Sequence, residues 1–142
     1  EGVEAELGAR FVDLDSLFTQ SDIISINCPH TPETHHLVNA ERLAQMRPDA
    51  YLVNTSRGEV LEEDALIKAL QSGQIAGAGL DVYVNEPHVD PRLLDLPNTV
   101  LLPHMGSATY EGRAAMGEKV IANIRAWVDG HRPPDQVLEG WD

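Results

Sequence analysis

The chain has 142 residues, of which 42% are hydrophobic and 23% charged, a composition typical of one folded domain and not of a disordered segment. Its net charge of −13 excludes nucleic acid and anionic membrane surfaces as partners of the domain as a whole. The single cysteine, Cys28, excludes an internal disulfide and fits the reducing cytoplasm, and no apolar run approaches the roughly 20 residues of a membrane span.

Short apolar runs alternate with helix-like stretches along the chain, which predicts an α/β fold with a mostly parallel sheet. The middle runs are apolar without polar alternation, as expected for strands that are covered on both faces. The predicted strands are residues 10–12, 23–26, 50–53, 75–80 and 100–102.

Capping residues define the helices between these strands. Asn39 is expected to cap a helix over residues 40–46, and Gly73 to end a helix over residues 62–72. Further helices are predicted over residues 13–18, from residue 31, from residue 90 and over residues 110–129. In the last of these, apolar side chains recur at helical spacing, which predicts a face packed in the core: Met116, Val120, Ile124, Trp127 and Val128.

Three residues that can bind or move charge follow the ends of predicted strands: Arg57, Glu86 and His104. Ligands of parallel sheets collect at the carboxyl ends of the strands. An arginine fork matches a carboxylate, and a histidine paired with a carboxylate can act as a general acid near neutral pH. The sequence therefore predicts a site that binds an anion and moves a proton.

Taken singly, each of these residues also has an ordinary structural explanation. Arg57 could be a surface arginine after a polar turn, Glu86 part of an exposed Glu-Pro turn, and His104 a hydrogen-bonded loop histidine. Asp81, at the end of the predicted strand 75–80, could equally cap a loop or contact a ligand.

Other polar clusters point to no chemistry. His30, His35 and His36 do not share a helix face, so we interpret them as solvated loop histidines and predict no metal site. Nothing near Cys28 in the sequence supplies a base to activate it. Gly77-Ala78-Gly79 leads into strand residues and not into a helix, so it is not a dinucleotide fingerprint.

Three motifs, taken in order, resemble those of the D-isomer-specific 2-hydroxyacid dehydrogenases, and most closely the glyoxylate/hydroxypyruvate reductase group. The resemblance covers nearly the whole chain. It implies a Rossmann-like, doubly wound sheet and an NAD- or NADP-dependent interconversion of a small 2-oxo acid and a D-2-hydroxy acid. The motifs are Asn54-Thr55-Ser56-Arg57-Gly58, then Gly79-Leu80-Asp81-Val82-Tyr83 with Glu86-Pro87, then Pro103-His104-Met105-Gly106-Ser107-Ala108-Thr109.

The resemblance also implies roles for single residues. Arg57 would bind the substrate carboxylate, His104 would be the acid or base at the carbonyl oxygen, and Glu86 would hold and polarise His104. Asp81 would contact the nicotinamide carboxamide, while Cys28 and Pro29 would line the adenosine side. The residues expected at the cofactor are Cys28, Pro29, Thr55, Ser56, Asp81, His104 and Gly106.

The chain departs from the family at its beginning. It opens on Glu1 without a methionine, and the family's first βαβ unit with its Gly-x-Gly-x-x-Gly turn is missing. We therefore expect residues 1–134 to be the C-terminal portion of a dinucleotide-binding domain and residues 135–142 a tail toward a missing substrate domain. The residue that selects NAD or NADP would lie upstream, and the resemblance implies a homodimer at full length.

Two alternatives stay open. Formate dehydrogenases resemble this family but usually carry glutamine where this chain has Glu86, which favours the hydroxyacid branch. Dinucleotide-sensing corepressor scaffolds carry the same arginine, glutamate and histidine, so only turnover of a 2-oxo acid by the intact protein separates them.

Overall fold

The computed structural model describes residues 2–137. The chain divides between His104 and Met105 into two compact units, residues 1–104 and residues 105–142. The first unit holds the sheet, and the second holds the long helix and the segment that follows it.

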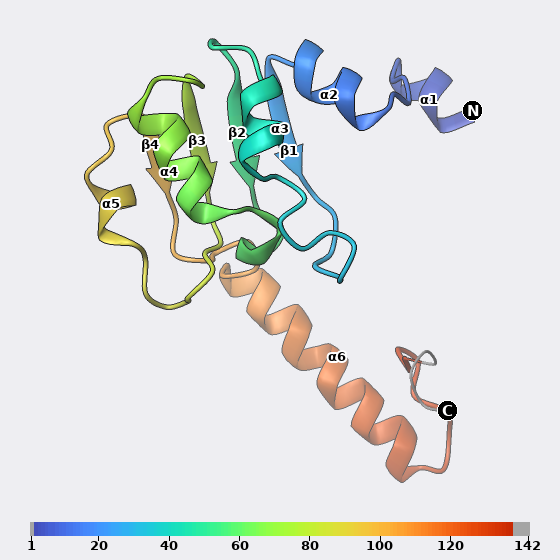
Figure 1. Ribbon diagram of the computed structural model, residues 1–142. Helices are drawn as coiled ribbons and strands as arrows, with labels where there is room; N and C mark the ends of the chain where they lie inside the picture. Colours follow the sequence, from blue (N-terminus) through green and yellow to red (C-terminus); the bar gives the residue numbers. More distant parts are fainter. Residues whose placement is uncertain (1, 138–142) are drawn as a thin grey trace. The chain divides into compact units, whose positions relative to one another are not determined.

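A parallel sheet of four strands forms the centre of the first unit, in the order β1-β2-β3-β4. All strands point the same way, so their carboxyl ends share one edge (Figure 1). This confirms the predicted α/β fold and parallel sheet. The strands are β1 (Ile23–Ile26), β2 (Tyr51–Asn54), β3 (Gly77–Leu80) and β4 (Thr99–Leu101).

The helices begin largely where the capping residues predicted. The Asn39 side chain accepts a hydrogen bond from the backbone N–H of Arg42 at 3.0 Å, and Gly73 adopts a φ of +70° after α4. The elements are α1 (Gly2–Leu7), α2 (Leu14–Gln20), α3 (Ala40–Gln45), the 3₁₀ helix η1 (Gly58–Val60), α4 (Glu63–Gln71), α5 (Pro91–Leu94) and α6 (Tyr110–Val128). None of the described helices is both long and apolar enough to span a membrane.

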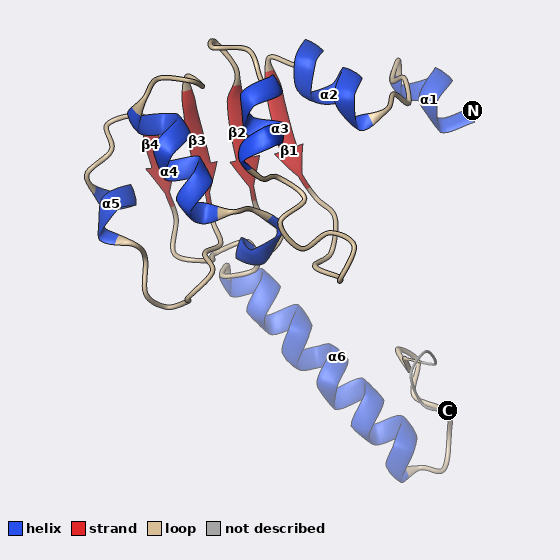
Figure 2. Cartoon of the chain, viewed as in Figure 1, coloured by secondary structure: helices blue, strands red, loops and turns tan. Residues whose placement is uncertain are grey.

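The core lies between the sheet and the helices α3 and α4, which cover one of its faces (Figure 2). Leu43, Leu52 and Leu66 are fully buried there. On the opposite face Ile23 of β1 is 65% exposed and Tyr51 of β2 is 51% exposed, so within the first unit the prediction of middle strands covered on both faces is wrong for these two strands. Each strand lies beside the strand that precedes it in the sequence. Right-handed connections between parallel strands in this order place the connecting helices on the same face of the sheet.

Two predicted elements are absent from the described structure. Residues 10–12 form no strand: Phe11 is 86% exposed and its N–H donates to the Glu4 carboxylate at 2.7 Å, because no described strand lies beside it to pair with. No helix starts at Thr31. The Thr34 hydroxyl instead donates to the Pro29 carbonyl at 2.7 Å, a local bond that competes with helix formation.

Within the second unit the apolar stripe of α6 is largely exposed, so the predicted packing into a core is not seen there. Val120 is 58% exposed and Trp127 is 74% exposed, and no residue of α6 is classed as buried. An amphipathic pattern identifies a face that can pack but does not name what it packs against. Within the second unit the segment after α6 folds back beside the helix, where Asp135 pairs with Lys119 at 2.6 Å, but it leaves most of the stripe exposed.

Candidate active site

Asn54 builds the turn that presents Arg57. It is fully buried at the end of β2, and its side-chain oxygen accepts hydrogen bonds from the N–H and the hydroxyl of Ser56, each at 3.1 Å. Its side-chain amide donates to the Arg57 carbonyl at 3.0 Å. Asn54 was assigned no role of its own from the sequence, although an asparagine at a strand end commonly forms an Asx turn with the backbone two residues on.

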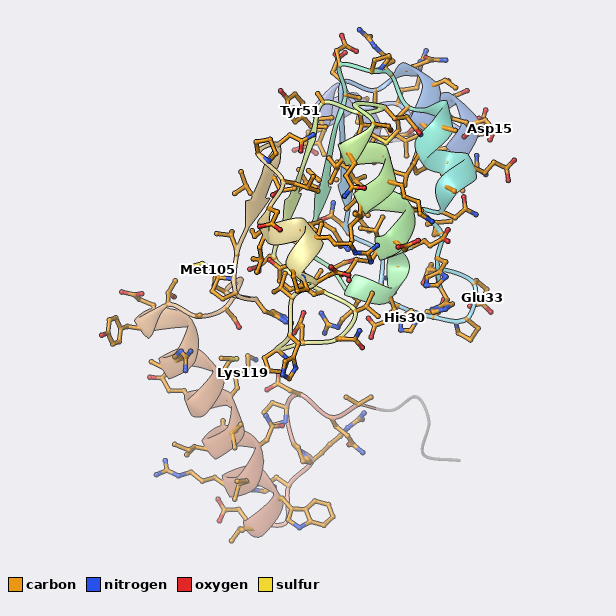
Figure 3. The ribbon with its side chains drawn as sticks, turned by 60° about the vertical axis from the view of Figure 1, so that its left-hand side comes forward. Asp15, His30, Glu33, Tyr51, Met105 and Lys119 are labelled. Carbon is orange, nitrogen blue, oxygen red and sulfur yellow. The ribbon has the colours of Figure 1, made fainter. Side chains whose placement is uncertain are left out.

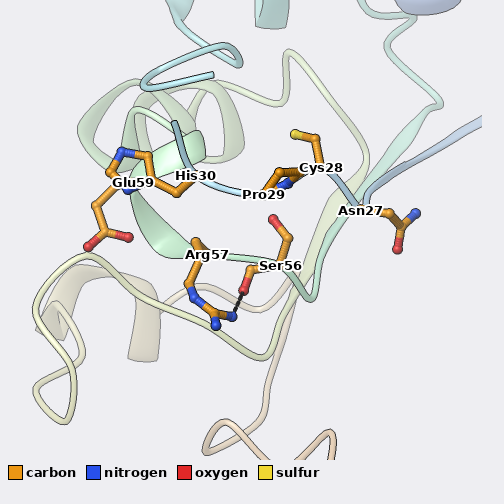
Figure 4. Close-up of a pocket in the computed structure, with 7 residues that line it drawn as sticks. All are labelled: Asn27, Cys28, Pro29, His30, Ser56, Arg57 and Glu59. Carbon is orange, nitrogen blue, oxygen red and sulfur yellow. Dashed lines mark hydrogen bonds between the residues drawn. The ribbon is translucent and has the colours of Figure 1, made fainter. Parts of the chain in front are cut away.

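The side chain of Arg57 is exposed, and its guanidinium donates to the Ser56 carbonyl at 2.6 Å (Figure 4). Most of its planar fork of donors is therefore available to an anion. Thr55, two residues before Arg57, is exposed in the same turn.

Gly58 allows the Arg57 turn to approach the loop after β3. A Cβ at this position would lie 2.1 Å from the carbonyl carbon of Tyr83, where no atom can fit. Only glycine permits this backbone contact. The turn after β2 and the loop that carries Glu86 are consequently packed backbone against backbone.

Glu86 and His104 form a hydrogen-bonded pair. The Nδ1 atom of His104 lies 2.6 Å from Oε2 of Glu86, and Oε1 of Glu86 accepts the backbone N–H of Tyr83 at 3.0 Å. An ionised carboxylate only accepts hydrogen bonds, so the pair assigns the proton to Nδ1 of His104. This contact joins two residues that are 18 positions apart in the sequence.

The pKa of the Glu86 carboxyl lies below its ordinary value, mainly because His104 donates a hydrogen bond to it. The N–H of Tyr83 and the positive charge of Arg57 act in the same direction. The carboxyl is thus held in its charged form. The effect of Arg57 also means that this cation is near enough to Glu86 to influence its charge.

His104 has a φ of +53°, in the left-handed region that non-glycine residues seldom adopt. Its side chain is 47% exposed, so the imidazole is open to solvent on one side while Glu86 holds it on the other. Asp81 is 5% exposed at the end of β3, and its N–H donates to the Asn54 carbonyl at 3.0 Å.

A hollow of about 640 Å³ lies at the carboxyl ends of β1 and β2, which is within the size range of small-ligand sites (Figure 4). It brings together Cys28 and Pro29 after β1 with Ser56 and Arg57 after β2. Thr55, Asp81, Glu86 and His104 are not among its lining residues, and Gly106 belongs to the second unit. The lining consists of Asn27, Cys28, Pro29, His30, Ser56, Arg57 and Glu59.

The histidines near this hollow contact one another. Nε2 of His30 lies 3.1 Å from Nδ1 of His35, and the rings of His35 and His36 stack with centroids 4.0 Å apart. His30 lies at the opposite end of the sheet from Tyr51, the first residue of β2 (Figure 3). Within the described part of the chain, no group of three or more His, Cys, Asp or Glu side chains is arranged to hold a metal ion.

A family model described as "D-isomer specific 2-hydroxyacid dehydrogenase, NAD binding domain" matches residues 1–106. The glyoxylate reductase of Thermococcus litoralis is 49% identical over 134 residues, which cover 94% of this chain and 40% of that protein. The glyoxylate/hydroxypyruvate reductase B of Pectobacterium carotovorum is 52% identical over 128 residues, again 40% of its length. The chain thus spans about two fifths of these relatives.

Solved structures of similar proteins have the same fold. The NADPH-dependent glyoxylate/hydroxypyruvate reductase of Sinorhizobium meliloti, in complex with NADP and malonate, superimposes with a TM-score of 0.84 at 41% identity and covers 88% of this chain and 39% of that one. A glyoxylate reductase described from Paecilomyes thermophila reaches 0.88 at 42% identity, covering 96% of this chain and 42% of that one. The sheet and its helices are therefore those of a Rossmann-like NAD-binding domain.

Proposed function

Because this chain belongs to the D-isomer specific 2-hydroxyacid dehydrogenase family, in its NAD binding domain, we propose that the intact protein reduces small 2-oxo acids with NADH or NADPH. Glyoxylate and hydroxypyruvate are the proposed substrates, since the relatives at about half identity carry those names. The observation that carries the proposal is the hydrogen bond between His104 and Glu86 at 2.6 Å, with the guanidinium of Arg57 near enough to lower the pKa of the same carboxyl.

The hollow between the ends of β1 and β2 suits one part of a dinucleotide. Its wall includes Cys28 and Pro29, the guanidinium of Arg57 and the carboxylate of Glu59. The residues that would hold the cofactor are Cys28, Pro29, Thr55, Ser56, Asp81, His104 and Gly106. When bound, the reduced nicotinamide supplies a hydride, and the protein contributes position and charge.

Arg57 would bind the carboxylate of the 2-oxo acid. Its exposed guanidinium offers paired donors in the geometry that a carboxylate accepts. The S. meliloti relative is described with malonate, a small dicarboxylate, which supports a site for a compact anionic ligand. With a net charge of −13 on the chain, such an anion needs a local cation.

His104 would hold the proton that the carbonyl oxygen receives. Glu86 fixes the proton on Nδ1, so Nε2 is the atom that can exchange a proton with the substrate. In the imidazolium form His104 would donate from Nε2 to the carbonyl oxygen, while its Nδ1–H stays hydrogen-bonded to Glu86 at 2.6 Å. In the reverse direction the neutral imidazole would accept the proton from the hydroxy acid.

Domain and assembly predictions belong to the same proposal. Residues 1–134 would be the C-terminal portion of the dinucleotide-binding domain, and residues 135–142 would lead toward the substrate domain of a homodimeric protein. Of that tail, residues 138–142 lie outside the described residues.

The test is the variant His104→Ala in the intact protein that contains this chain. We expect kcat for glyoxylate or hydroxypyruvate reduction to fall by about 10²–10⁴, the typical value of a general acid. His131→Ala, at an exposed histidine after α6, is the matched control and should leave kcat unchanged.

Undiminished turnover in His104→Ala would overturn the assignment. If the unmodified intact protein binds NAD(P)H but reduces no 2-oxo acid, a dinucleotide-sensing scaffold becomes the better description. Both results come from one spectrophotometric assay of nicotinamide oxidation together with a cofactor titration.

A further inference from the structure

Tyr83 contacts all three of the segments that carry the candidate catalytic side chains. Its ring is 6% exposed and belongs to the hydrophobic core, while its polar atoms point to the ends of neighbouring strands. We propose that Tyr83 is a positioning residue that holds these three segments in one arrangement. The expected effect of Tyr83 on catalysis rests on the proposed function, whereas its effect on the arrangement of the three segments does not.

The first contact reaches the segment of His104. The Tyr83 hydroxyl lies 2.9 Å from the Leu102 carbonyl oxygen and 3.2 Å from the Leu80 carbonyl oxygen, so its single proton is shared between these two acceptors. Leu102 is followed by Pro103, which has no N–H, and then by His104. The hydroxyl therefore ties the end of β3 to the chain just before the histidine.

The second contact reaches Glu86. The backbone N–H of Tyr83 donates to Oε1 of Glu86 at 3.0 Å, while Oε2 pairs with His104. The two carboxylate oxygens are thus divided between a fixed backbone donor and the imidazole. A carboxylate held at one oxygen loses much of its rotational freedom, so the other oxygen is presented to the histidine in a defined direction.

The third contact reaches the turn of Arg57. The backbone of Gly58 packs against the carbonyl group of Tyr83 so closely that no Cβ would fit between them. Because Gly58 follows Arg57 directly, a shift of the Tyr83 backbone would move the arginine as well. One residue thus couples the ends of β2, β3 and β4 through a hydroxyl, an amide and a backbone contact.

The hydroxyl can be removed without disturbing the other two contacts. Tyr83→Phe keeps the ring, the N–H and the backbone, and loses only the bonds to the Leu102 and Leu80 carbonyls. Burial raises the pKa of the Tyr83 hydroxyl, so the group remains a donor at neutral pH. We expect the segment of His104 to be held less firmly in the variant, and the bond between His104 and Glu86 to be populated less.

The direct test is a carboxyl ¹³C NMR titration of Glu86 in the 142-residue chain, with Glu86→Gln used to assign the resonance. In Tyr83→Phe the pKa of the Glu86 carboxyl should rise toward its ordinary value, because its main cause, the His104 hydrogen bond, is weakened. Tyr110→Phe, at a tyrosine that is 91% exposed, is the control and should leave that titration unchanged. A folded Tyr83→Phe chain with an unchanged Glu86 titration would overturn the proposal.

A second measurement needs no variant. In the unmodified chain the Tyr83 hydroxyl proton should exchange slowly enough with water to give an NMR signal, whereas that of Tyr110 should not. Rapid exchange at Tyr83 would contradict the proposed tie.

In the intact protein, Tyr83→Phe should lower kcat by about threefold to tenfold and change KM less. The reason is that the substitution would displace His104, the proposed acid, and would leave Arg57, the proposed carboxylate-binding residue, in place. Equal losses in kcat in Tyr83→Phe and Tyr110→Phe would contradict the catalytic part. If the unmodified protein shows no reductase activity, the proposed function fails, and the NMR titration still decides the structural part.

Discussion

At the scale of single residues, Glu86 is the point where the candidate site is held together. Each of its carboxylate oxygens has its own hydrogen-bond partner, one on the main chain and one on His104. Because both partners stabilise the charged form, the pKa of Glu86 lies below its ordinary value. A carboxylate that stays ionised at neutral pH can hold a neighbouring histidine in place while that histidine gains and loses a proton.

This lowered pKa predicts a pH-dependent contribution to stability. A depressed carboxyl pKa stabilises the folded chain above the ordinary value of 4.5, and the contribution is lost as the pH falls from there through the folded value. Glu86→Gln should therefore unfold more easily than the unmodified chain at pH 6–7, and the difference should shrink toward about pH 3.

Urea denaturation at a series of pH values measures the difference. The side chain of Glu86 is 34% exposed, so solvent screening should keep it below about 1 kcal/mol. Glu118→Gln, at an exposed position of α6, is the control and should follow the unmodified chain at every pH. A stability difference for Glu86→Gln that is the same at pH 7 and pH 3 would exclude this account.

At the scale of elements, the site depends on how closely the ends of β2 and β3 approach each other. The 3₁₀ helix η1 starts at Gly58, which is buried against the backbone of Tyr83 and Val84. The side chain of Asn54 stabilises the same turn through hydrogen bonds to the Ser56 hydroxyl and the Arg57 carbonyl. The backbone of Arg57 is thus positioned by the packing of Gly58 and by the buried Asn54 amide, while its side chain adds one hydrogen bond to the Ser56 carbonyl.

Gly58→Ala should consequently be strongly destabilising. Its new methyl group would overlap the main chain of Tyr83, and forced overpacking typically costs about 1–3 kcal/mol. The matched control is Gly79→Ala in β3, where the nearest atom to a new Cβ is 3.9 Å away. We expect the control to change stability by less than about 1 kcal/mol. Similar urea midpoints for the two variants would show that the backbone contact is not as tight as described.

The long helix α6 has no buried side chain, whereas α4 in the first unit has five. A helix that buries no side chain in its own unit depends largely on its intrinsic propensity, which is marginal for lengths near 15–20 residues. Backbone amides of α6 should therefore exchange with solvent much faster than those of α4 in the 142-residue chain. Hydrogen-exchange mass spectrometry compares the two helices in one experiment, and equal protection would contradict the exposed stripe.

At the scale of the whole molecule, the chain contains the three candidate site residues Arg57, Glu86 and His104 but no sequence of the type that binds pyrophosphate. No Gly-x-Gly-x-x-Gly turn occurs among its 142 residues. Its net charge of −13 also opposes the binding of a dinucleotide anion. The chain spans about two fifths of the relatives it matches, so the remaining contacts to a cofactor would come from other parts of the intact protein.

We therefore expect the isolated 142-residue chain to bind neither NADH nor NADPH with a micromolar Kd. Isothermal titration calorimetry with each nucleotide measures this directly, with the intact protein as the positive control. Micromolar binding by the isolated chain would mean that the hollow at β1 and β2 is sufficient by itself.

The sequence by itself determined the features that depend on neighbouring residues. Asn39 predicted the start of α3 and Gly73 the end of α4, since a cap or a left-handed glycine acts within one turn of backbone. The parallel sheet followed from the alternation of apolar runs and helices. The motif residues Arg57, Glu86 and His104 were identified from their places after those runs.

Only the tertiary structure decided what depends on contacts between distant residues. It brought His104 to 2.6 Å from Glu86, buried one face of the sheet, and replaced the predicted helix at Thr31 with a turn fixed by the Thr34 hydroxyl. The roles of Asn54 and Tyr83 were missed for the same reason. Each acts through hydrogen bonds whose partners are set by the path of the chain, and residue type alone does not specify that path.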